Sequence, residues 1–180
     1  MSNPEDWETV VELAEATFGP VHALANIAGI CPGRDSLATN STEFMNRIIQ
    51  VNLMGSMFGM RAVLPGMIER GRGKIVNTSS ISSLNGYPAL AAYSASKGAV
   101  DAVTRQAAKE YGGHGISINA IAPGSVATAM HANHQDTVRK ILEERGDAAA
   151  ATPDRPAEIF SFLMSPASDY LNGIVIRCGN

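Results

Sequence analysis

Hydrophobic residues recur every three or four positions in several stretches of the chain, a spacing typical of helices with one buried face. Asn3 can cap the first of these stretches and Gly19 can end it, whereas Asn40 and Glu43 form a capping pattern before the second. Pro65 interrupts the second stretch and is expected to kink or end that helix. The sequence thus predicts helices at about 4–18, 41–69, 91–111 and 156–164.

Short apolar runs separate these helical stretches and predict buried strands. The runs lie at 21–26, 74–80, 115–124 and 173–177, and turn-forming residues such as Gly, Pro and Ser follow the first three. Because helices and strands alternate along the chain, we expect an α/β fold with a parallel sheet covered by helices on both faces. The length of 180 residues is enough for one core, which favours a single domain over residues 1–180.

Composition argues against several classes of partner. A net charge of −3 with a pI of about 5.8 provides no concentrated positive charge for nucleic acid or an anionic membrane surface. No apolar run approaches the roughly 20 residues that cross a bilayer. Cys31 and Cys178 lack the spacing of metal ligands, and the first residues resemble no secretory signal. We therefore expect free thiols, no metal site and a cytoplasmic protein.

The stretch YSASKGAV, residues 93–100, contains the strongest candidate for chemistry. On a helix, Tyr93 and Lys97 lie one turn apart on the same face, where both can reach one ligand. A nearby ammonium favours the phenolate and so lowers the pKa of a tyrosine toward the range of a general acid or base. The pair alone is weak support, because it also arises by chance and because the surrounding small residues suit tight helix packing as well as close approach of a ligand.

The context of the pair is more informative. In NTSSISSLNGYPALAAYSASKGAV, residues 77–100, a strand ends at a serine, a loop returns and the helix with the Tyr/Lys pair begins. This order resembles the short-chain dehydrogenase/reductase family, over nearly all of the chain. The resemblance implies a Rossmann-like doubly wound parallel sheet, NAD(H) or NADP(H) as cofactor, a small alcohol or carbonyl compound as substrate, and a homodimer or homotetramer. The implied reaction interconverts an alcohol and a ketone or aldehyde by hydride transfer.

The resemblance also assigns roles to individual residues. Tyr93 matches the family's catalytic tyrosine, the general acid/base, and Lys97 matches the lysine that lowers the tyrosine pKa and holds the nicotinamide ribose. Ser80 matches the serine that hydrogen-bonds the substrate oxygen, and Asn52 the asparagine that bends its helix and holds a water in the proton relay. The serines at 79, 82 and 83 compete with Ser80, and only its spacing of thirteen residues before the tyrosine selects it.

Two further motifs are similar to cofactor-binding segments of the family. NIAG, residues 26–29, resembles the family's Asn-Asn-Ala-Gly with Ile27 in place of the second asparagine, and PGSVAT, residues 123–128, resembles the turn that holds the nicotinamide amide. The histidines at 22, 114, 131 and 134 are expected at the surface or in loops. The cofactor-binding residues that the resemblance implies are Asn26, Ala28, Gly29, Tyr93, Lys97, Pro123, Gly124, Val126 and Thr128.

One expected element is missing from the chain. A Rossmann unit holds the cofactor's pyrophosphate at a glycine-rich turn after its first strand, and this sequence contains no such turn. We therefore expect an N-terminally truncated Rossmann-like fold that retains strands four to seven of the family. An alternative hypothesis is a non-catalytic chain that associates with partner subunits through the helices at 41–69 and 91–111, or an inactive fragment.

Overall fold

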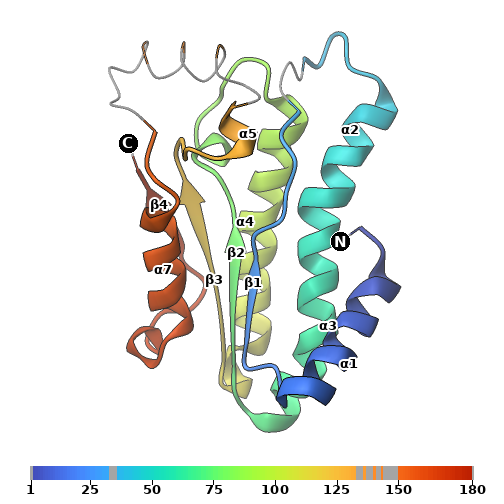
Figure 1. Ribbon diagram of the computed structural model, residues 1–180, viewed down its shortest axis with the longest axis vertical. Coiled ribbons are helices and arrows are strands. Elements are labelled where there is room, and N and C mark those ends of the chain that lie inside the picture. The colour runs from blue at the N-terminus through green and yellow to red at the C-terminus, as the bar shows by residue number, and fades with distance from the viewer. Residues whose placement is uncertain are drawn as a thin grey trace.

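A computed structural model describes residues 2–32, 36–132, 136, 140, 143 and 150–179. Its centre is a parallel sheet in the order β1-β2-β3-β4 (Figure 1). Short apolar segments form these strands, and β2 and β3 are buried along most of their length. The strands are β1 (Ala23–Asn26), β2 (Gly73–Thr78), β3 (Ile116–Pro123) and β4 (Val175–Cys178).

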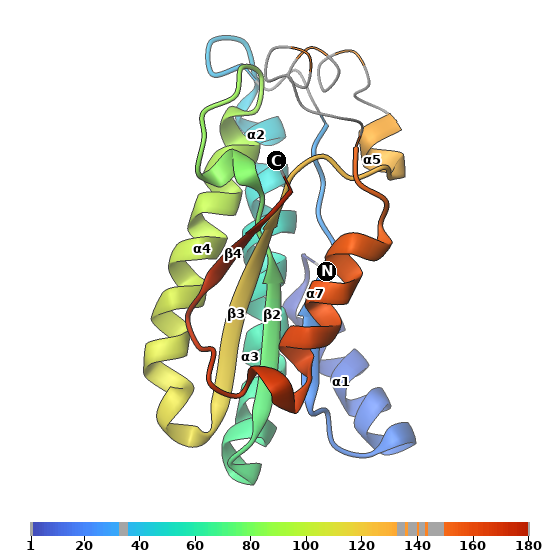
Figure 2. The ribbon, with the colours of Figure 1, turned by 90° about the vertical axis from the view of Figure 1, so that its left-hand side faces the viewer.

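Helices cover both faces of the sheet, which confirms the doubly wound α/β fold expected from the sequence. Helices α3 and α4 lie on one face and α7 lies on the other (Figure 2), and α1 packs against α3. In the described part of the chain the helices are α1 (Pro4–Phe18), α2 (Thr42–Ile49), α3 (Gly55–Arg70), α4 (Ala91–Tyr111), α5 (Ala129–Ala132) and α7 (Asp154–Met164).

Each face of the sheet has its own hydrophobic core. On one face, Met67 and Val63 of α3 pack with Ile75 and Ile118 of the strands, and alanines of α4 complete the cluster. On the other face, Phe160 and Leu163 of α7 pack against β2 and β3. Burial of these side chains fixes α3, α4 and α7 against the sheet, because each large apolar side chain contributes roughly 1.5–3 kcal/mol when removed from water.

The segment expected as one helix at 41–69 is divided in the structure. Helix α2 is followed by a π-helical turn over Gln50–Met54, and α3 then continues through Pro65 to Arg70. Of the two outcomes expected at Pro65, a helix end or a kink, the end is therefore wrong. Buried side chains on both sides of the proline hold the helix on the sheet despite the lost hydrogen bond. The cap is also shifted, because the Ser41 hydroxyl, and not Asn40, accepts from the amide of Phe44.

The remaining boundaries agree with the sequence to within about two residues. Asn3 caps α1 as expected, accepting from the amide of Glu5, and Gly19 ends it with a φ of 82°. Strand β1 lies at one edge of the sheet, and no strand of the described residues pairs with its outer side. None of the described helices combines the length and the apolar character that a membrane span requires.

Candidate active site

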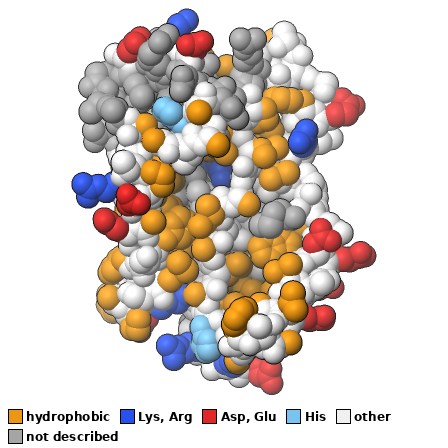
Figure 3. Space-filling model, in the orientation of Figure 1, with side chains coloured by type: hydrophobic (Ala, Val, Ile, Leu, Met, Phe, Trp, Pro, Cys, Tyr) orange, Lys and Arg blue, Asp and Glu red, His pale blue; other side chains and the backbone are white. Residues whose placement is uncertain are grey.

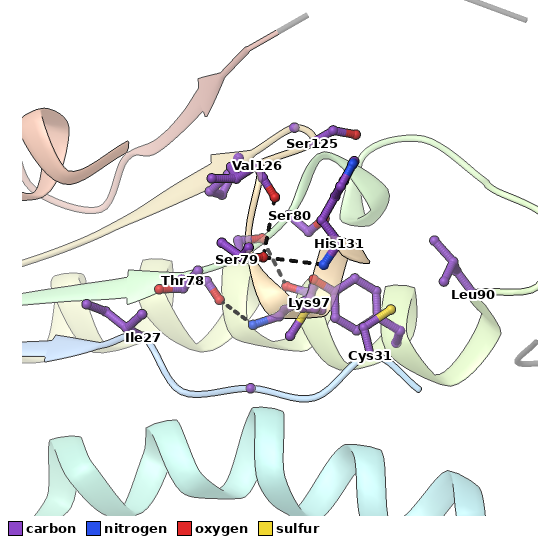
Figure 4. Close-up of a pocket in the computed structure, with 16 residues that line it drawn as sticks. Ile27, Cys31, Thr78, Ser79, Ser80, Leu90, Lys97, Ser125, Val126 and His131 are labelled. Atoms are coloured by element: carbon purple, nitrogen blue, oxygen red, sulfur yellow. Dashed lines mark hydrogen bonds between the residues drawn. The ribbon is translucent and has the colours of Figure 1, made fainter. Parts of the chain in front are cut away.

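A cavity of about 230 Å³ opens where the strands end at their carboxyl sides (Figure 4). Ligands of open parallel sheets bind at this edge, because the loops that follow neighbouring strands converge there. Loops after β1, β2 and β3 and the helices α4 and α5 all contribute to the wall. The lining residues are Ile27, Gly29, Cys31, Thr78, Ser79, Ser80, Leu90, Tyr93, Lys97, Pro123, Gly124, Ser125, Val126, Thr128, Met130 and His131.

Helix α4 carries both members of the Tyr/Lys pair to this cavity. Strong helix formers and small residues make up its first three turns, which lets the helix lie close to the loops after β1 and β2. Tyr93 and Lys97 are separated by one turn, and the Lys97 ammonium lies 5.8 Å from the centre of the Tyr93 ring. The structure thus places the two side chains side by side at one wall of the cavity.

Lys97 is held in a fixed position at the base of the cavity. The residue is only 3% exposed, and its ammonium donates to the main-chain carbonyl of Thr78 at 2.7 Å. Burial lowers the pKa of Lys97 to about 8, although negative charge at Cys31 and Asp101 favours the ammonium. The lysine is therefore mainly protonated at neutral pH and loses its proton in the mildly alkaline range.

The Tyr93 phenol behaves differently from the sequence-based expectation. Burial raises its pKa to about 12, negative charge at Cys31 adds to the rise, and a hydrogen bond with Ser80 opposes it. The ammonium of Lys97, which donates to the Thr78 carbonyl, is not among the main influences on this pKa. In this geometry Tyr93 is a phenol at neutral pH, which suits a proton donor.

The structure separates Ser80 from the other serines nearby. Ser80 lines the cavity and hydrogen-bonds with Tyr93, and it caps the short helical turn at Ile81–Ser83 by accepting from the amide of Ser82. Ser79 is buried, and its hydroxyl is engaged by the Lys97 carbonyl and the Ser83 hydroxyl. Ser80 is thus the serine that faces the phenol.

Asn52 lies behind the cavity in the π-helical turn. It is fully buried, and its amide group both accepts from the amide of Ile30 at 2.7 Å and donates to the carbonyl of Ile30 at 2.9 Å. A third hydrogen bond joins it to the hydroxyl of Ser96 on α4 at 3.1 Å. Asn52 therefore ties the loop after β1 to the helix that carries Tyr93 and Lys97.

The expected cofactor residues divide into two groups. The structure brings Gly29 and the turn after β3 to the cavity together with Tyr93 and Lys97. It does not bring Asn26 or Ala28 there: Asn26 is buried and donates to Asn77 and to the Ser56 carbonyl, and Ala28 is exposed outside the lining. The turn residues that line the cavity are Pro123, Gly124, Val126 and Thr128.

The wall of the cavity fits the nicotinamide end of the expected cofactor. A side chain at Gly29 would place its Cβ 3.2 Å from Asn52 Oδ1 and 3.4 Å from Lys97 Nζ, so glycine keeps this approach to the lysine open. The buried hydroxyl of Thr78 has no hydrogen-bond partner among the described residues, and a ligand can supply one. The fit does not extend to the pyrophosphate end, for which this sequence contains no glycine-rich turn.

Some lining residues were not singled out in the sequence. Cys31 lies close enough for its charge to act on both Tyr93 and Lys97, and the half-buried His131 of α5 lines the cavity. Neither position has a local signal, because only the folded chain brings them to the pair. His134 lies outside the described residues.

Comparison with known proteins identifies the relatives of this chain. The model of the short chain dehydrogenase family matches residues 1–139. A protein of Xanthobacter autotrophicus named inactive 2-(S)-hydroxypropyl-CoM dehydrogenase 2 is 39% identical over 90% of this chain and 73% of its own length. The chain belongs to the short-chain dehydrogenase family.

Other short-chain dehydrogenases are similar along almost the whole chain. Cyclohexanol dehydrogenase of an Acinetobacter species is 34% identical over 96% of this chain and 68% of its own length. The crystal structure of a gluconate 5-dehydrogenase from Burkholderia cenocepacia, in complex with NADP and tartrate, matches with a TM-score of 0.90 and 30% identity over 99% of this chain and 71% of that one. The expected class, a nicotinamide-dependent oxidoreductase, is thereby confirmed.

Among the residues that the structure describes, no group of His, Cys, Asp and Glu side chains could hold a metal ion. Cys31 and Cys178 are both reduced thiols. Cys178 is half-buried, and burial raises the pKa of its thiol, as expected for a packing residue.

Proposed function

We propose that this short-chain dehydrogenase interconverts a small alcohol and its ketone or aldehyde, with Tyr93 as the general acid/base and NAD(H) or NADP(H) as the cofactor. The observation that carries the proposal is the convergence of Tyr93, Lys97 and Ser80 on one cavity at the carboxyl edge of the sheet. The acid, the cation and the hydroxyl donor required for carbonyl reduction are all present there.

The residues act most simply in the direction of reduction. When bound, the nicotinamide supplies the hydride. The Tyr93 phenol, protonated at neutral pH, donates its proton to the carbonyl oxygen, and the Ser80 hydroxyl donates a hydrogen bond to the same oxygen. The positive charge of Lys97 stabilises the phenolate that remains after transfer.

Three further residues prepare this arrangement. Asn52 holds the loop after β1 beside Lys97 through its hydrogen bonds to Ile30 and to the Ser96 hydroxyl. Gly29 and Thr128 would contact the nicotinamide end of the cofactor from opposite walls. Apolar side chains such as Leu90 and Val126 line much of the remaining wall, which favours a substrate with a compact hydrocarbon body.

A second candidate function is a non-catalytic chain that associates with other subunits. The name of the Xanthobacter relative describes that protein as inactive, and the present sequence contains no glycine-rich turn. A groove between α3 and α4, lined by Met57, Leu64 and Val103 among others, offers an apolar surface for a homodimer or homotetramer. This candidate predicts association without saturable cofactor binding.

Titration of the purified chain with NADH and NADPH, followed by nicotinamide fluorescence, separates the two candidates. We expect saturable binding that is lost in Lys97→Ala. Tyr93→Phe should retain the binding but lower reduction of a small ketone such as cyclohexanone by about 10²–10⁴-fold. A folded chain that binds neither nucleotide, or a Tyr93→Phe variant with unchanged turnover, would overturn the catalytic proposal.

The pair Ser80→Ala and Ser79→Ala provides a matched test of the serine. Because Ser80 faces Tyr93 and Ser79 is engaged by main-chain and serine partners, the first change should lower turnover far more than the second at equal cofactor binding. Equal losses in both variants would show that the serine loop contributes only through its conformation.

A further inference from the structure

Asp101 is a buried carboxylate that the proposed reaction does not use. It lies on α4 one helical turn beyond Lys97 and is 3% exposed. One of its oxygens, Oδ2, accepts from the Ser83 hydroxyl at 2.6 Å, and the other, Oδ1, has no hydrogen-bond partner in the described part of the chain. A buried carboxylate with one hydrogen bond destabilises the fold unless other interactions compensate. Asp101 therefore needs stabilising interactions with the groups around it.

Hydrogen bonds connect this carboxylate to the loop that carries Ser80. The Ser83 hydroxyl lies 2.6 Å from Asp101 Oδ2, 2.7 Å from the Ser80 carbonyl and 3.2 Å from the Ser79 hydroxyl. The amide of Ser83 also donates to the Ser80 carbonyl at 3.0 Å. Since a serine hydroxyl has one proton, the short contact to a charged acceptor is the favoured one. Asp101 thereby anchors the Ser80 loop to α4.

The same carboxylate acts on Lys97 through its charge. The titratable groups that face Lys97 are Tyr93 and Asp101 from α4, Cys31 from the loop after β1 and His131 from α5, which lines the same cavity. Negative charge at Asp101 raises the pKa of Lys97 and opposes the effect of burial. In the interior this attraction is screened far less than it is in water.

We propose that Asp101 is a positioning residue of the active site, which fixes the Ser80 loop through Ser83 and keeps the side chain of Lys97 cationic through its charge. Asp101 contacts neither the cavity nor the reacting atoms, so it acts through Ser83 and Lys97. The reaction to which this applies is the one in the proposed function, but the effect on Lys97 exists whether or not the chain turns over.

Two variants separate the charge from the hydrogen bond. Asp101→Asn has nearly the same shape and keeps an oxygen for Ser83, so it removes mainly the charge. Ser83→Ala removes the hydrogen bond and keeps the charge. Asp154→Asn, at the exposed start of α7, is the matched control for the loss of one negative charge. If Asp101→Asn does not fold, Asp101→Ser replaces it.

The decisive readout is the titration of Lys97 by NMR of the chain labelled at its lysines, with the signal assigned by its loss in Lys97→Met. We expect Asp101→Asn to lower the pKa of Lys97 by about half a unit or more, and Ser83→Ala and Asp154→Asn to leave it within error. A residue with a merely structural role would lower the melting temperature without this shift. An unchanged Lys97 titration in a folded Asp101→Asn variant overturns the proposal.

Turnover supplies the second readout where it can be measured. Both Asp101→Asn and Ser83→Ala should lower kcat, by several-fold or more, with little change in KM, and only Asp101→Asn should move the alkaline limb of the pH profile to lower pH. Identical profiles in the two variants contradict the proposed charge effect. If the wild-type chain shows no turnover, the proposed function fails while the lysine titration still decides the role of Asp101.

Discussion

At the scale of single residues, the site is governed by burial more than by charge pairing. Tyr93 and Lys97 lie side by side, yet burial moves both pKa values toward the neutral forms, upward for the phenol and downward for the ammonium. The spacing in the sequence predicts that Tyr93 and Lys97 lie close together. It does not predict that burial outweighs charge pairing in setting their pKa values, because burial depends on the loops that cover α4 in the folded chain. The protonation states of the two side chains therefore follow from tertiary structure.

The depressed pKa of Lys97 predicts a pH-dependent stability. The unfolded lysine keeps its proton up to about pH 10.5 and the folded one only up to about pH 8, so between these values the unfolded state binds more protons. The free energy of unfolding should then rise with pH, by up to about 1.4 kcal/mol per unit between about pH 8 and pH 10. Above about pH 10 ionisation of Tyr93 in the unfolded chain opposes the rise.

Urea denaturation over this pH range, in wild type and Lys97→Met, checks the prediction. The variant lacks the titrating group, so the difference between the two free energies isolates the contribution of Lys97. Parallel pH curves for the two proteins would show that the lysine is solvated in the folded state.

At the scale of elements, local sequence predicts best where packing and local preference agree. The helix at 91–111 is rich in alanine and other strong helix formers, has an apolar face to bury, and coincides with α4. The stretch at 41–69 misleads, because apolar residues repeat at helical spacing on both sides of Asn52 and a pattern of this kind does not register a widened turn. His131 and Cys31 could not be found at all, since only long-range packing brings α5 and the loop after β1 to α4.

Two glycines on different helices make a matched prediction about packing. A Cβ at Gly59 of α3 would lie 2.7 Å from Asn26 Oδ1 and 3.0 Å from the ring of Trp7, which joins α1 to α3. We expect Gly59→Ala to destabilise the protein by about 1–3 kcal/mol. Gly98 of α4 has no atom within 4 Å of such a Cβ, so Gly98→Ala should stabilise by about 0.5–1 kcal/mol.

Thermal or urea unfolding of both glycine variants measures the contrast. The opposite signs matter more than the sizes, because both changes add the same methyl group to a helix. Stabilisation by Gly59→Ala would mean that α1 is not held against α3 as described.

At the scale of the whole molecule, the surface around β1 stands out. Figure 3 shows hydrophobic side chains gathered over β1 and the neighbouring α1 and α7. Several of them are largely exposed, and an edge strand beside them offers unpaired main-chain groups. The largely exposed apolar side chains of these elements are Val10 56%, Leu13 67% and Phe18 87% of α1, Ile27 60% directly after β1, and Phe162 43% of α7.

This surface predicts that the chain associates with itself as its concentration rises. Replacing Leu13 and Phe18 together by Ser should raise the dissociation constant at least about tenfold, because each buried side chain contributes roughly 1.5–3 kcal/mol. Tyr170→Ser is the control, since that fully exposed side chain lies on the separate turn after α7. Sedimentation velocity over a concentration series checks this; a wild type that stays monomeric throughout contradicts it.

The π-helical turn before α3 also sets the rotation of α3 about the helix axis relative to α2. One extra residue in a turn rotates everything after it by about 100° relative to a regular α-helix. Helix α2 accordingly packs against α4, whereas α3 packs mainly against α1, β1 and β2 and touches α4 less. Deleting one residue from 50–54 would leave a regular α-helix with complete main-chain hydrogen bonding. The deletion would, however, rotate the buried face of α2 away from α4 or the buried face of α3 away from the strands. The π-helical turn thus rotates the side chains of α3 about the helix axis relative to those of α2, although the two helices are continuous. Asn52 lies within this turn.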